Sequence, residues 1–415
     1  MMKSRNLRLS QLDALPDYDP ASMPVEQARE LVQQFLTPLT ATETVSLHTA
    51  LHRTLSHDVL SPLHVPPHDY SAMDGYALPF SNLTRLQVIG SSYAGHAFEG
   101  VVTAGACVRI MTGALIPKGC DSVVMQEQVS IEGDTITLSS KVHRGQNIRR
   151  VGEDMQQGSQ VLECGQIIRP AQMGLLASLG FDEVTVYRKL KVAIFSTGDE
   201  LQQPGTPLAP GQIYDSNRYS LHGLLGELNV EVLDMGNIRD ERASIKTALL
   251  DAAQQADVII TSGGVSVGEA DYIKQLLAEI GEVVFWKIAM KPGRPLAYGK
   301  IGTCHFFGLP GNPVAVMVTF MQFVRDALCK LMGQAVQPPF TFNAICTSPI
   351  RKIPGRTEFQ RGIFSQNENG AWVVRTTGEQ GSGILSSMSK ANCFIVLPLA
   401  QGNVEAGDHV VVQPF

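Results

Sequence analysis

A helical stripe opens the patterned part of the chain. Apolar residues recur with the spacing of one helical face at Ala28, Leu31, Val32 and Phe35. This spacing predicts a helix over residues 24–36, with Ser22 as its N-cap and Pro24 in its first turn. Two further helices are expected over residues 45–55 and 172–179.

Short β-rich runs punctuated by glycine fill the stretch between these helices. Residues 129–138 predict a hairpin that turns at Glu132-Gly133-Asp134. Because helical segments lie on both sides of this stretch, we expect a β-rich subdomain of residues 61–154. It is inserted into an N-terminal helical and linker subdomain formed by residues 1–60 and 155–188.

Strands and helices alternate in the next part of the chain. Near-continuous apolar runs such as 190–195 and 256–260 end in polar, glycine-containing loops. Amphipathic helices follow Asp215 and Asp240, and another is expected over residues 269–280. Strands that are apolar on both faces and alternate with helices are typical of a parallel sheet covered on both sides. We therefore predict a three-layer α/β domain over residues 189–333.

Pro338-Pro339 marks the next boundary, and the last stretch consists of strand-like runs separated by glycine turns. This pattern predicts a small C-terminal β-barrel or sandwich over residues 334–415. The predicted fold class is therefore multidomain: an α/β domain, a helical subdomain with a β-rich insert, and a small barrel.

Charge and cysteine content narrow the function classes. The chain has 33 Lys and Arg against 39 Asp and Glu, a net charge of −6, which disfavours a general nucleic-acid binder. No apolar run reaches the length of about 18 residues that a membrane span needs, and the first residues do not resemble a secretory signal. The seven cysteines are scattered without a CxxC pair, which favours reduced thiols in a cytoplasmic protein over disulfides or structural zinc.

Three loops carry the candidate binding chemistry. Residues 196–200, 261–266 and 308–313 each follow a predicted parallel strand, so they meet at one sheet edge, where ligands of α/β proteins bind. Hydroxyls and backbone N–H groups beside glycine suit a phosphate or another oxyanion. The candidate residues in these loops are Thr197, Gly198, Ser262, Gly263, Gly264, Pro310, Gly311, Asn312 and Pro313. The alternative is that glycine and proline only form tight turns.

Charged residues near these loops add a second feature. Glu200 and Asp271 would repel an anion unless a cation bridged them, and Mg²⁺ is the natural bridge to phosphate oxygens. Taken alone, Asp271 is also explained as a solvated acid in the first turn of a helix. Lys287, Lys291 and Arg294 form a positive patch that would hold anionic groups, or else an ordinary solvated loop.

One short motif points to another class of enzyme. Residues 264–268 match GxSxG, the nucleophile elbow of α/β-hydrolases. Such an enzyme needs a histidine further along the chain, and only His305 and His409 follow. His305 lies within a predicted strand and His409 near the end of the C-terminal domain, so the match is weak.

Taken together, the motifs resemble the molybdopterin molybdenumtransferase family, which includes MoeA and the E-domain of gephyrin. They occur in the family's order and cover residues 60–415; they are SAMDGYA, RIMTGA, VVMQEQ, GQNIRRVGEDM, FSTGDEL, GQIYDSN, TSGGVSVGEADY, KPGRP, GLPGNPVA, FQRG and NCFIVLP. The resemblance implies an enzyme that inserts molybdate into adenylylated molybdopterin, requires Mg²⁺, releases AMP and forms molybdenum cofactor. It also implies a homodimer whose sites are shared between chains, with possible contacts to the adenylyltransferase and to apo-molybdoenzymes.

The resemblance also assigns roles by motif. It implies a catalytic set made of Asp74, Thr112, Asp154, Glu200, Asp240 and Asp271, with Glu200 and Asp271 as Mg²⁺ ligands. It implies anion-binding roles for Lys287, Lys291, Arg361 and Ser382, and places Pro310 and Pro313 in the family's LPGNP loop. Two positions depart from the family: Arg294 replaces the usual second lysine of KPGKP, and Tyr70 replaces a frequent asparagine.

Two other hypotheses stay open at this point. One is an adenylyltransferase-like or nucleotide pyrophosphatase activity of the α/β domain, although the flanking β-regions disfavour it. The other is a non-catalytic scaffold, because the E-domain of gephyrin also clusters receptors.

Overall fold

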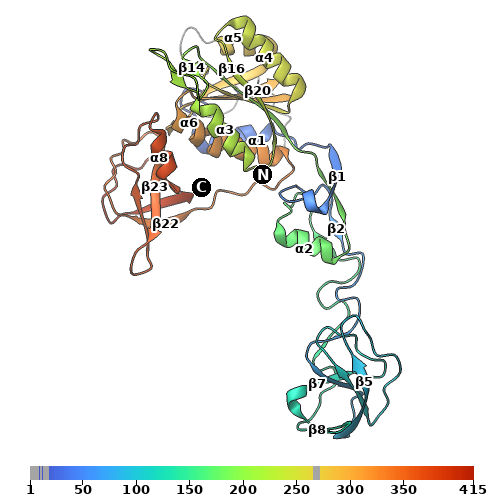
Figure 1. Ribbon diagram of the computed structural model, residues 1–415. Coiled ribbons are helices and arrows are strands. Elements are labelled where there is room, and N and C mark those ends of the chain that lie inside the picture. Colours follow the sequence, from blue (N-terminus) through green and yellow to red (C-terminus); the bar gives the residue numbers. More distant parts are fainter. Residues whose placement is uncertain (1–8, 10–11, 13–17, 265–271) are drawn as a thin grey trace. The chain divides into compact units, whose positions relative to one another are not determined.

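The computed structural model describes residues 9, 12, 18–264 and 272–415. The chain divides into two compact units (Figure 1). Unit 1 comprises Met1–Glu43, His52–Ser56 and Thr185–Phe415, and unit 2 comprises Thr44–Leu51 and His57–Val184. The subdomain boundaries expected from the sequence stay predictions.

A six-stranded sheet forms the centre of unit 1. Its strand order is β16 (Glu231–Ile238), β13 (Lys191–Thr197), β17 (Val258–Ser262), β21 (Cys304–Leu309), β20 (Pro295–Ile301) and β18 (Glu282–Lys287). The first four strands are parallel, as predicted. The expectation of a wholly parallel sheet was wrong for β20, which pairs antiparallel with both β21 and β18, so that β18 again runs in the direction of the first four strands. The two residues Gly302-Thr303 join β20 to β21, and so tight a connection reverses the chain direction.

Helices cover both faces of this sheet, so the predicted three-layer arrangement is confirmed (Figure 1). Alternate residues of β13 enter opposite cores: Val192 and Ile194 pack on one face, and Ala193 and Phe195 on the other. The first face is covered by α1 (Val25–Gln34), α3 (Ser216–Gly226) and the helical run α6 (Pro313–Thr319), η4 (Phe320–Val324) and α7 (Arg325–Leu331). The second face is covered by α4 (Arg242–Gln255) and α5 (Tyr272–Ile280).

His305 is buried at the start of β21 and gives the stability of the protein a pH dependence. Burial, together with the positive charge of Lys300, lowers the pKa of His305 to about 4. An unfolded histidine keeps a pKa near 6.5, so below that pH the unfolded chain takes up a proton that the folded chain resists. Stability is therefore complete above about pH 6.5 and decreases as the pH falls toward 4.

We expect wild-type protein to lose about 2 kcal/mol more stability between pH 7 and pH 5 than His305→Gln does. Melting temperatures at the two pH values, measured by calorimetry, provide the comparison. His409→Gln, which changes an exposed histidine of the barrel, is the control and should keep the wild-type difference. An unchanged pH slope in His305→Gln would contradict the expectation.

The N-terminal helices only partly match the sequence pattern. The helix expected over residues 24–36 is confirmed as α1, but its N-cap is Pro24, without a side-chain cap, and not Ser22. The helix expected over residues 45–55 is wrong: the segment holds the end of β1 (Thr42–Ser46) and the short 3-10 helix η2 (Leu47–Thr49). Thr42, Thr44 and Val45 are β-branched, which favours the extended conformation here.

Unit 2 contains the β-rich insert. Its six-stranded sheet has the order β7 (Ser122–Met125), β4 (Gly75–Leu78), β6 (Ala106–Ile110), β5 (Arg85–Ser92), β9 (Thr135–Leu138) and β8 (Val129–Glu132). The hairpin predicted at residues 129–138 is confirmed by the antiparallel pair β8 and β9. The helix expected over residues 172–179 is confirmed as α2 (Pro170–Ser178). Smaller elements are β2 (Val59–Leu60) with β11 (Gln160–Leu162), β3 (Tyr70–Ser71) with β10 (Ile148–Arg149), and η3 (Gln126–Gln128).

The C-terminal part of unit 1 is a closed five-stranded barrel, as the sequence predicted. Its circular order is β23 (Thr357–Gln366), β24 (Trp372–Thr376), β22 (Phe342–Cys346), β26 (His409–Pro414) and β25 (Cys393–Leu397), which pairs again with β23. The short strand β19 (Met290–Lys291) adds to β23, and α8 (Leu385–Lys390) precedes β25.

The remaining strands are β12 (Glu183–Tyr187), β14 (Leu201–Gln202) and β15 (Ile213–Tyr214). Within the described part of the chain, no helix combines the length and the apolarity needed to cross a membrane.

Candidate active site

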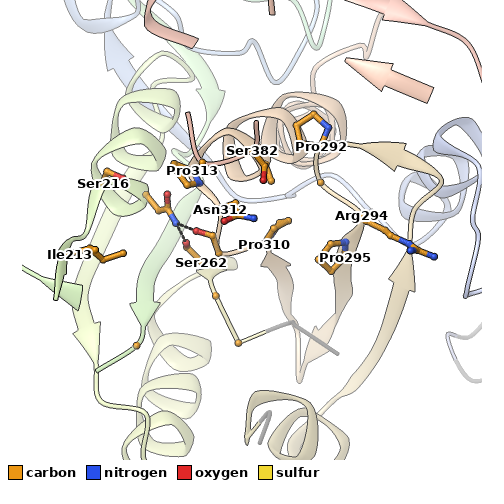
Figure 2. Close-up of a pocket in the computed structure, with 18 of the residues that line it drawn as sticks. Ile213, Ser216, Ser262, Pro292, Arg294, Pro295, Pro310, Asn312, Pro313 and Ser382 are labelled. Atoms are coloured by element: carbon orange, nitrogen blue, oxygen red, sulfur yellow. Dashed lines mark hydrogen bonds between the residues drawn. The ribbon is translucent and has the colours of Figure 1, made fainter. Parts of the chain in front are cut away.

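A cavity of about 1070 Å³ opens at the carboxyl ends of β13, β17 and β21 (Figure 2). The register of the parallel strands explains why their carboxyl ends meet here. Ser262 at the end of β17 pairs with Ser196 of β13 and with Leu309 of β21. The cavity brings together fourteen residues that the sequence singled out: Thr197, Gly198, Glu200, Asp240, Ser262, Gly263, Gly264, Lys291, Arg294, Pro310, Gly311, Asn312, Pro313 and Ser382.

Gly264 shows why the loop after β17 needs glycine. Its φ is +69°, and a Cβ atom at this position would lie 2.2 Å from Cδ1 of Ile273. A side chain at this position would displace Ile273 of α5 and would also be strained by the positive φ, so the loop favours glycine here. Backbone N–H groups in such a loop are accessible to an oxyanion.

Asn217 connects two of the loops by hydrogen bonds. It was not among the predicted site residues. Its Nδ2 donates to Oγ of Ser262 at 2.8 Å and to the carbonyl oxygen of Gly311 at 2.7 Å. The side chain of one α3 residue thus connects the ends of two different strands (Figure 2). The only signal in the sequence was its place in the GQIYDSN motif.

Asp215 lines the cavity and fixes the start of α3. Only 2% of this residue is exposed, and its carboxylate accepts from Ser196 Oγ at 3.1 Å and from the Arg218 backbone N–H at 3.2 Å. Arg218 Nε lies 3.2 Å from the same carboxylate, and its Nη1 lies 2.7 Å from Asp234. A buried charge that is fully paired in this way holds the helix N-terminus at the cavity wall.

Three carboxylates are close to one another at one side of the cavity. Burial, followed by the negative charges of Asp199 and Glu200, raises the pKa of Asp240. The Asp240 backbone N–H also donates to Oδ1 of Asp199 at 3.4 Å, and the Glu200 carboxylate lies over Gly198. Asp199 was not among the predicted site residues, although it belongs to the same STGDEL motif. Mutual repulsion of this kind favours a bound cation.

Positive side chains form another part of the lining. Lys291, Arg294 and Arg356 border the cavity, and Arg294 thus keeps the positive charge at the position where the family usually has lysine. Lys291 Nζ lies 3.6 Å from Oε1 of the buried Glu358. Lys287 does not line the cavity: it is the last residue of β18, so part of the predicted basic loop is strand.

Arg361 lies behind the cavity wall instead of in it. The residue is 1% exposed; Nε donates to Ser387 Oγ at 3.0 Å and Nη2 to the Gly381 carbonyl at 3.1 Å. The adjacent Ser382 lines the cavity, and its carbonyl accepts from the Val314 N–H at 3.0 Å. Arg361 therefore braces the loop that carries Ser382.

Arg361→Lys should loosen this loop although it keeps the charge. A lysine ammonium cannot reproduce the planar fork that reaches Ser387 and Gly381, and one buried acceptor would lose its donor. We expect a loss of about 2 kcal/mol in unfolding free energy, measured as a lower midpoint in urea. Lys390→Arg, an exposed change on α8, is the control. Wild-type stability in Arg361→Lys would show that the hydrogen bonds of Arg361 to Ser387 and Gly381 contribute little to the unfolding free energy.

The remaining predicted acids lie in unit 2 or outside the described residues. Asp74 Oδ1 accepts from the Thr112 backbone N–H at 2.7 Å and from its hydroxyl at 2.8 Å, and these bonds lower the pKa of Asp74. The structure thus brings these two predicted residues together. Asp154 is exposed. Asp271 lies outside the described residues.

The hydrolase alternative does not fit the strand register. Ser266 lies outside the described residues, but Gly264 follows the carboxyl end of β17, whereas His305 pairs with Val258 at the opposite end. Four residues of strand separate the two ends by about 13 Å. His409 pairs with Ile345 in the barrel. His305 therefore lies at the end of the sheet opposite to Gly264, and His409 lies in the barrel.

The fold and the cavity define a multidomain protein whose α/β domain carries a cavity lined by carboxylates, cationic side chains and glycine-containing loops. Three family profiles match the chain: MoeA N-terminal region (domain I and II) over residues 23–180, probable molybdopterin binding domain over 193–330, and MoeA C-terminal region (domain IV) over 343–415. The chain therefore belongs to the family of molybdopterin molybdenumtransferases, the MoeA enzymes.

Individual relatives agree with this assignment. The molybdopterin molybdenumtransferase of Haemophilus influenzae is 49% identical over 94% of this chain and 98% of its own length. The enzyme of the same name from Nostoc is 34% identical over 89% of this chain and 88% of its own length. The crystal structure of the molybdopterin biosynthesis MoeA protein from Pyrococcus horikoshii superposes with a TM-score of 0.82 at 32% identity, covering 95% of this chain and all of that one.

Proposed function

We propose that this enzyme inserts molybdate into adenylylated molybdopterin, with Mg²⁺-dependent hydrolysis that releases AMP and yields molybdenum cofactor. The observation that supports this most directly is the composition of the cavity: it combines clustered carboxylates, cationic side chains and glycine-rich loops at the ends of three parallel strands. Cleavage of a phosphoanhydride requires stabilisation of charge on the phosphates, which this combination supplies.

The residues of the chain divide this work between them. The hydroxyl of Ser262 and the backbone at Gly263 and Gly264 provide donors for phosphate oxygens. Lys291 and Arg294 add positive charge for phosphate or for molybdate, which is a tetrahedral dianion. Ser382, held by Arg361 through Gly381, presents a hydroxyl to the same space.

The carboxylates fit Mg²⁺ by their chemistry. Mg²⁺ is usually held by one or two carboxylates together with phosphate oxygens and water. Within the described ranges, no group of three or more His, Cys, Asp or Glu side chains is placed to enclose a metal. Glu200 and Asp240, together with Asp271 as the resemblance implies, would hold the ion, with its shell completed by substrate. Mg²⁺ would then act as a Lewis acid that neutralises charge developing on the phosphates.

The role of unit 2 is proposed from the family resemblance. Asp74, Thr112 and Asp154 would complete the site in a homodimer in which each chain contributes to its partner's cleft. The Asp74–Thr112 pair supports this role, because two hydrogen bonds keep the carboxylate charged and oriented. We further propose a cytoplasmic location and transient contacts with the adenylyltransferase and with apo-molybdoenzymes.

The test is a turnover assay with purified protein, adenylylated molybdopterin, Mg²⁺ and molybdate. AMP release and transfer of cofactor to an apo-enzyme are followed. Molybdate-dependent AMP release that is lost in Asp271→Ala and retained in Ser266→Ala would support the proposal and remove the serine hydrolase.

Other outcomes would support the alternatives. Pyrophosphate release from ATP would indicate an adenylyltransferase or a pyrophosphatase. Tight binding of the adenylylated pterin without turnover would indicate a scaffold or carrier.

A further inference from the structure

Two apolar side chains are exposed on the wall of a mostly polar cavity. Ile213 is 56% exposed and Tyr214 is 44% exposed, and both line the cavity. Other apolar residues of the lining, such as Ile273 and Met290, are buried in the core. An exposed aromatic ring among charged groups is typical of a surface that a bound ligand covers.

Hydrogen bonds fix the position of this wall. The strand β15, which consists of Ile213 and Tyr214, pairs in parallel with β14. The Ile213 N–H donates to the Glu200 carbonyl at 2.9 Å, and the Tyr214 hydroxyl donates to the Thr206 carbonyl at 2.9 Å. The next residue is the buried Asp215, which is fixed by Ser196 and Arg218 as described above. The ring is therefore ordered before any ligand arrives, which lowers the entropy cost of stacking on it.

The charges of the cavity indicate what the wall would contact. Lys291, Arg294 and Arg356 line the same cavity and would bind the phosphate part of a ligand. In Figure 2, Ile213 and Arg294 lie at opposite sides of the view. A ligand that spans the cavity would thus place phosphate at one side and an uncharged, flat group at the other. A heteroaromatic ring joined to phosphate has this composition.

We propose that Tyr214 is the stacking platform for a heteroaromatic ring of the phosphate-bearing substrate, with Ile213 as an additional apolar contact. The inference rests on the proposed function and extends it to the recognition of the ring. The proposed substrate carries two such rings, a pterin and an adenine. Stacking on an aromatic face serves either ring, because every base has a π-face.

A purely structural role for Tyr214 gives a different expectation. Its hydroxyl anchors the loop between β14 and β15 at Thr206, so the residue could serve the loop alone. Tyr214→Phe separates the two roles, since it keeps the ring face and removes the anchor. Tyr214→Leu keeps apolar bulk and removes the flat face. Tyr219→Leu is the matched control, because Tyr219 is 49% exposed on α3 and does not line the cavity.

The experiment is isothermal titration calorimetry of the full-length chain with three probes: AMP, 6-hydroxymethylpterin monophosphate and ribose 5-phosphate. We expect Tyr214→Leu to weaken binding of at least one ring-bearing probe about 10-fold, and Ile213→Ala to weaken it less. Tyr214→Phe and Tyr219→Leu should stay within about 2-fold of wild type. Ribose 5-phosphate, which has no ring system of this kind, should bind all variants equally. The probe that loses affinity identifies the ring that stacks.

Several results would overturn the proposal. These are equal affinity of wild type and Tyr214→Leu for both ring-bearing probes, an equal loss for ribose 5-phosphate, an equal loss in Tyr214→Phe, or no binding of either ring-bearing probe to wild type. The outcome is independent of turnover. Ring-dependent binding without molybdate-dependent AMP release would sink the proposed function and leave the platform. Normal turnover, together with equal affinity of wild type and Tyr214→Leu for the ring-bearing probes, would support the proposed function and exclude the stacking role of Tyr214.

Discussion

Asp240→Asn is expected to reduce molybdate-dependent AMP release at least about 100-fold, the size typical for losing a group that stabilises transition-state charge. Asp240 lines the cavity with Glu200, and burial, followed by the negative charges of Asp199 and Glu200, raises the pKa of Asp240. A neutral amide at this position keeps the shape of the side chain and removes one of the charges that attract Mg²⁺. Glu200→Gln should cause a loss of similar size for the same reason.

The same variant should have the opposite effect on the stability of the Mg²⁺-free protein. A carboxyl group whose pKa is raised in the folded state destabilises the fold at pH values above that pKa, because its proton is lost against repulsion. Removing the charge in Asp240→Asn therefore leaves the melting temperature equal or slightly higher. Added Mg²⁺ should raise the melting temperature of wild type and have little effect on Asp240→Asn, since an ion that binds only the folded state stabilises it.

Asp251→Asn provides the matched control. Asp251 is exposed on α4 and does not line the cavity, so its variant should keep wild-type turnover and the wild-type response to Mg²⁺. Full turnover in both Asp240→Asn and Glu200→Gln would exclude these acids from the reaction. A melting temperature of Asp240→Asn that still rises with Mg²⁺ would place the ion elsewhere.

Asp215→Ala is expected to destabilise unit 1 by about 3 kcal/mol, the cost of removing one partner from a buried ion pair. The substitution removes the acceptor for Ser196 and for the N–H of Arg218, so the N-terminus of α3 loses its cap. It also leaves the Arg218 guanidinium, which is 13% exposed, with Asp234 as its remaining ion-pair partner within the described part of the chain. Tyr214, which directly precedes Asp215, and Asn217, two residues after it, would be held less firmly at the cavity.

Calorimetry can measure this effect. In a unit of this size, 3 kcal/mol corresponds to a decrease of about 5 °C in the midpoint of its transition. Asp234→Asn is the control, because Asp234 contacts the same arginine but is one-third exposed, and it should cost less than about 1 kcal/mol. Equal midpoints for Asp215→Ala and Asp234→Asn would show that burial does not strengthen the ion pair between Asp215 and Arg218.

The local parts of the fold could be predicted from the sequence. Hydrophobic periodicity predicted α1, the alternating strands and helices of the α/β domain, the hairpin at residues 129–138 and the barrel. These features depend on patterns within about ten residues, so they can be recognised in the sequence even when the contacts between distant segments are not known. The same method failed at residues 45–55, where the structure has the end of β1 and the short helix η2. The β-branched residues Thr44 and Val45 favour the extended conformation at the start of this segment.

The sequence by itself also determined much of the candidate site. Loops at the ends of parallel strands must meet at one edge, so Thr197, Ser262 and Pro310 could be grouped before any coordinates were known. Motif order added the family, which the three profiles and the relatives confirm.

The tertiary structure alone decided which side chains face the cavity and which support it. Arg361 and Lys291 are both cations of predicted anion-binding motifs, yet Arg361 is buried behind the wall and Lys291 lines it. Asn217 joins two loops through bonds to residues 45 and 94 positions away, and β20 runs antiparallel to both of its neighbours, β21 and β18. The physical reason is that burial and hydrogen bonding depend on contacts between segments distant in sequence, which side-chain periodicity cannot encode.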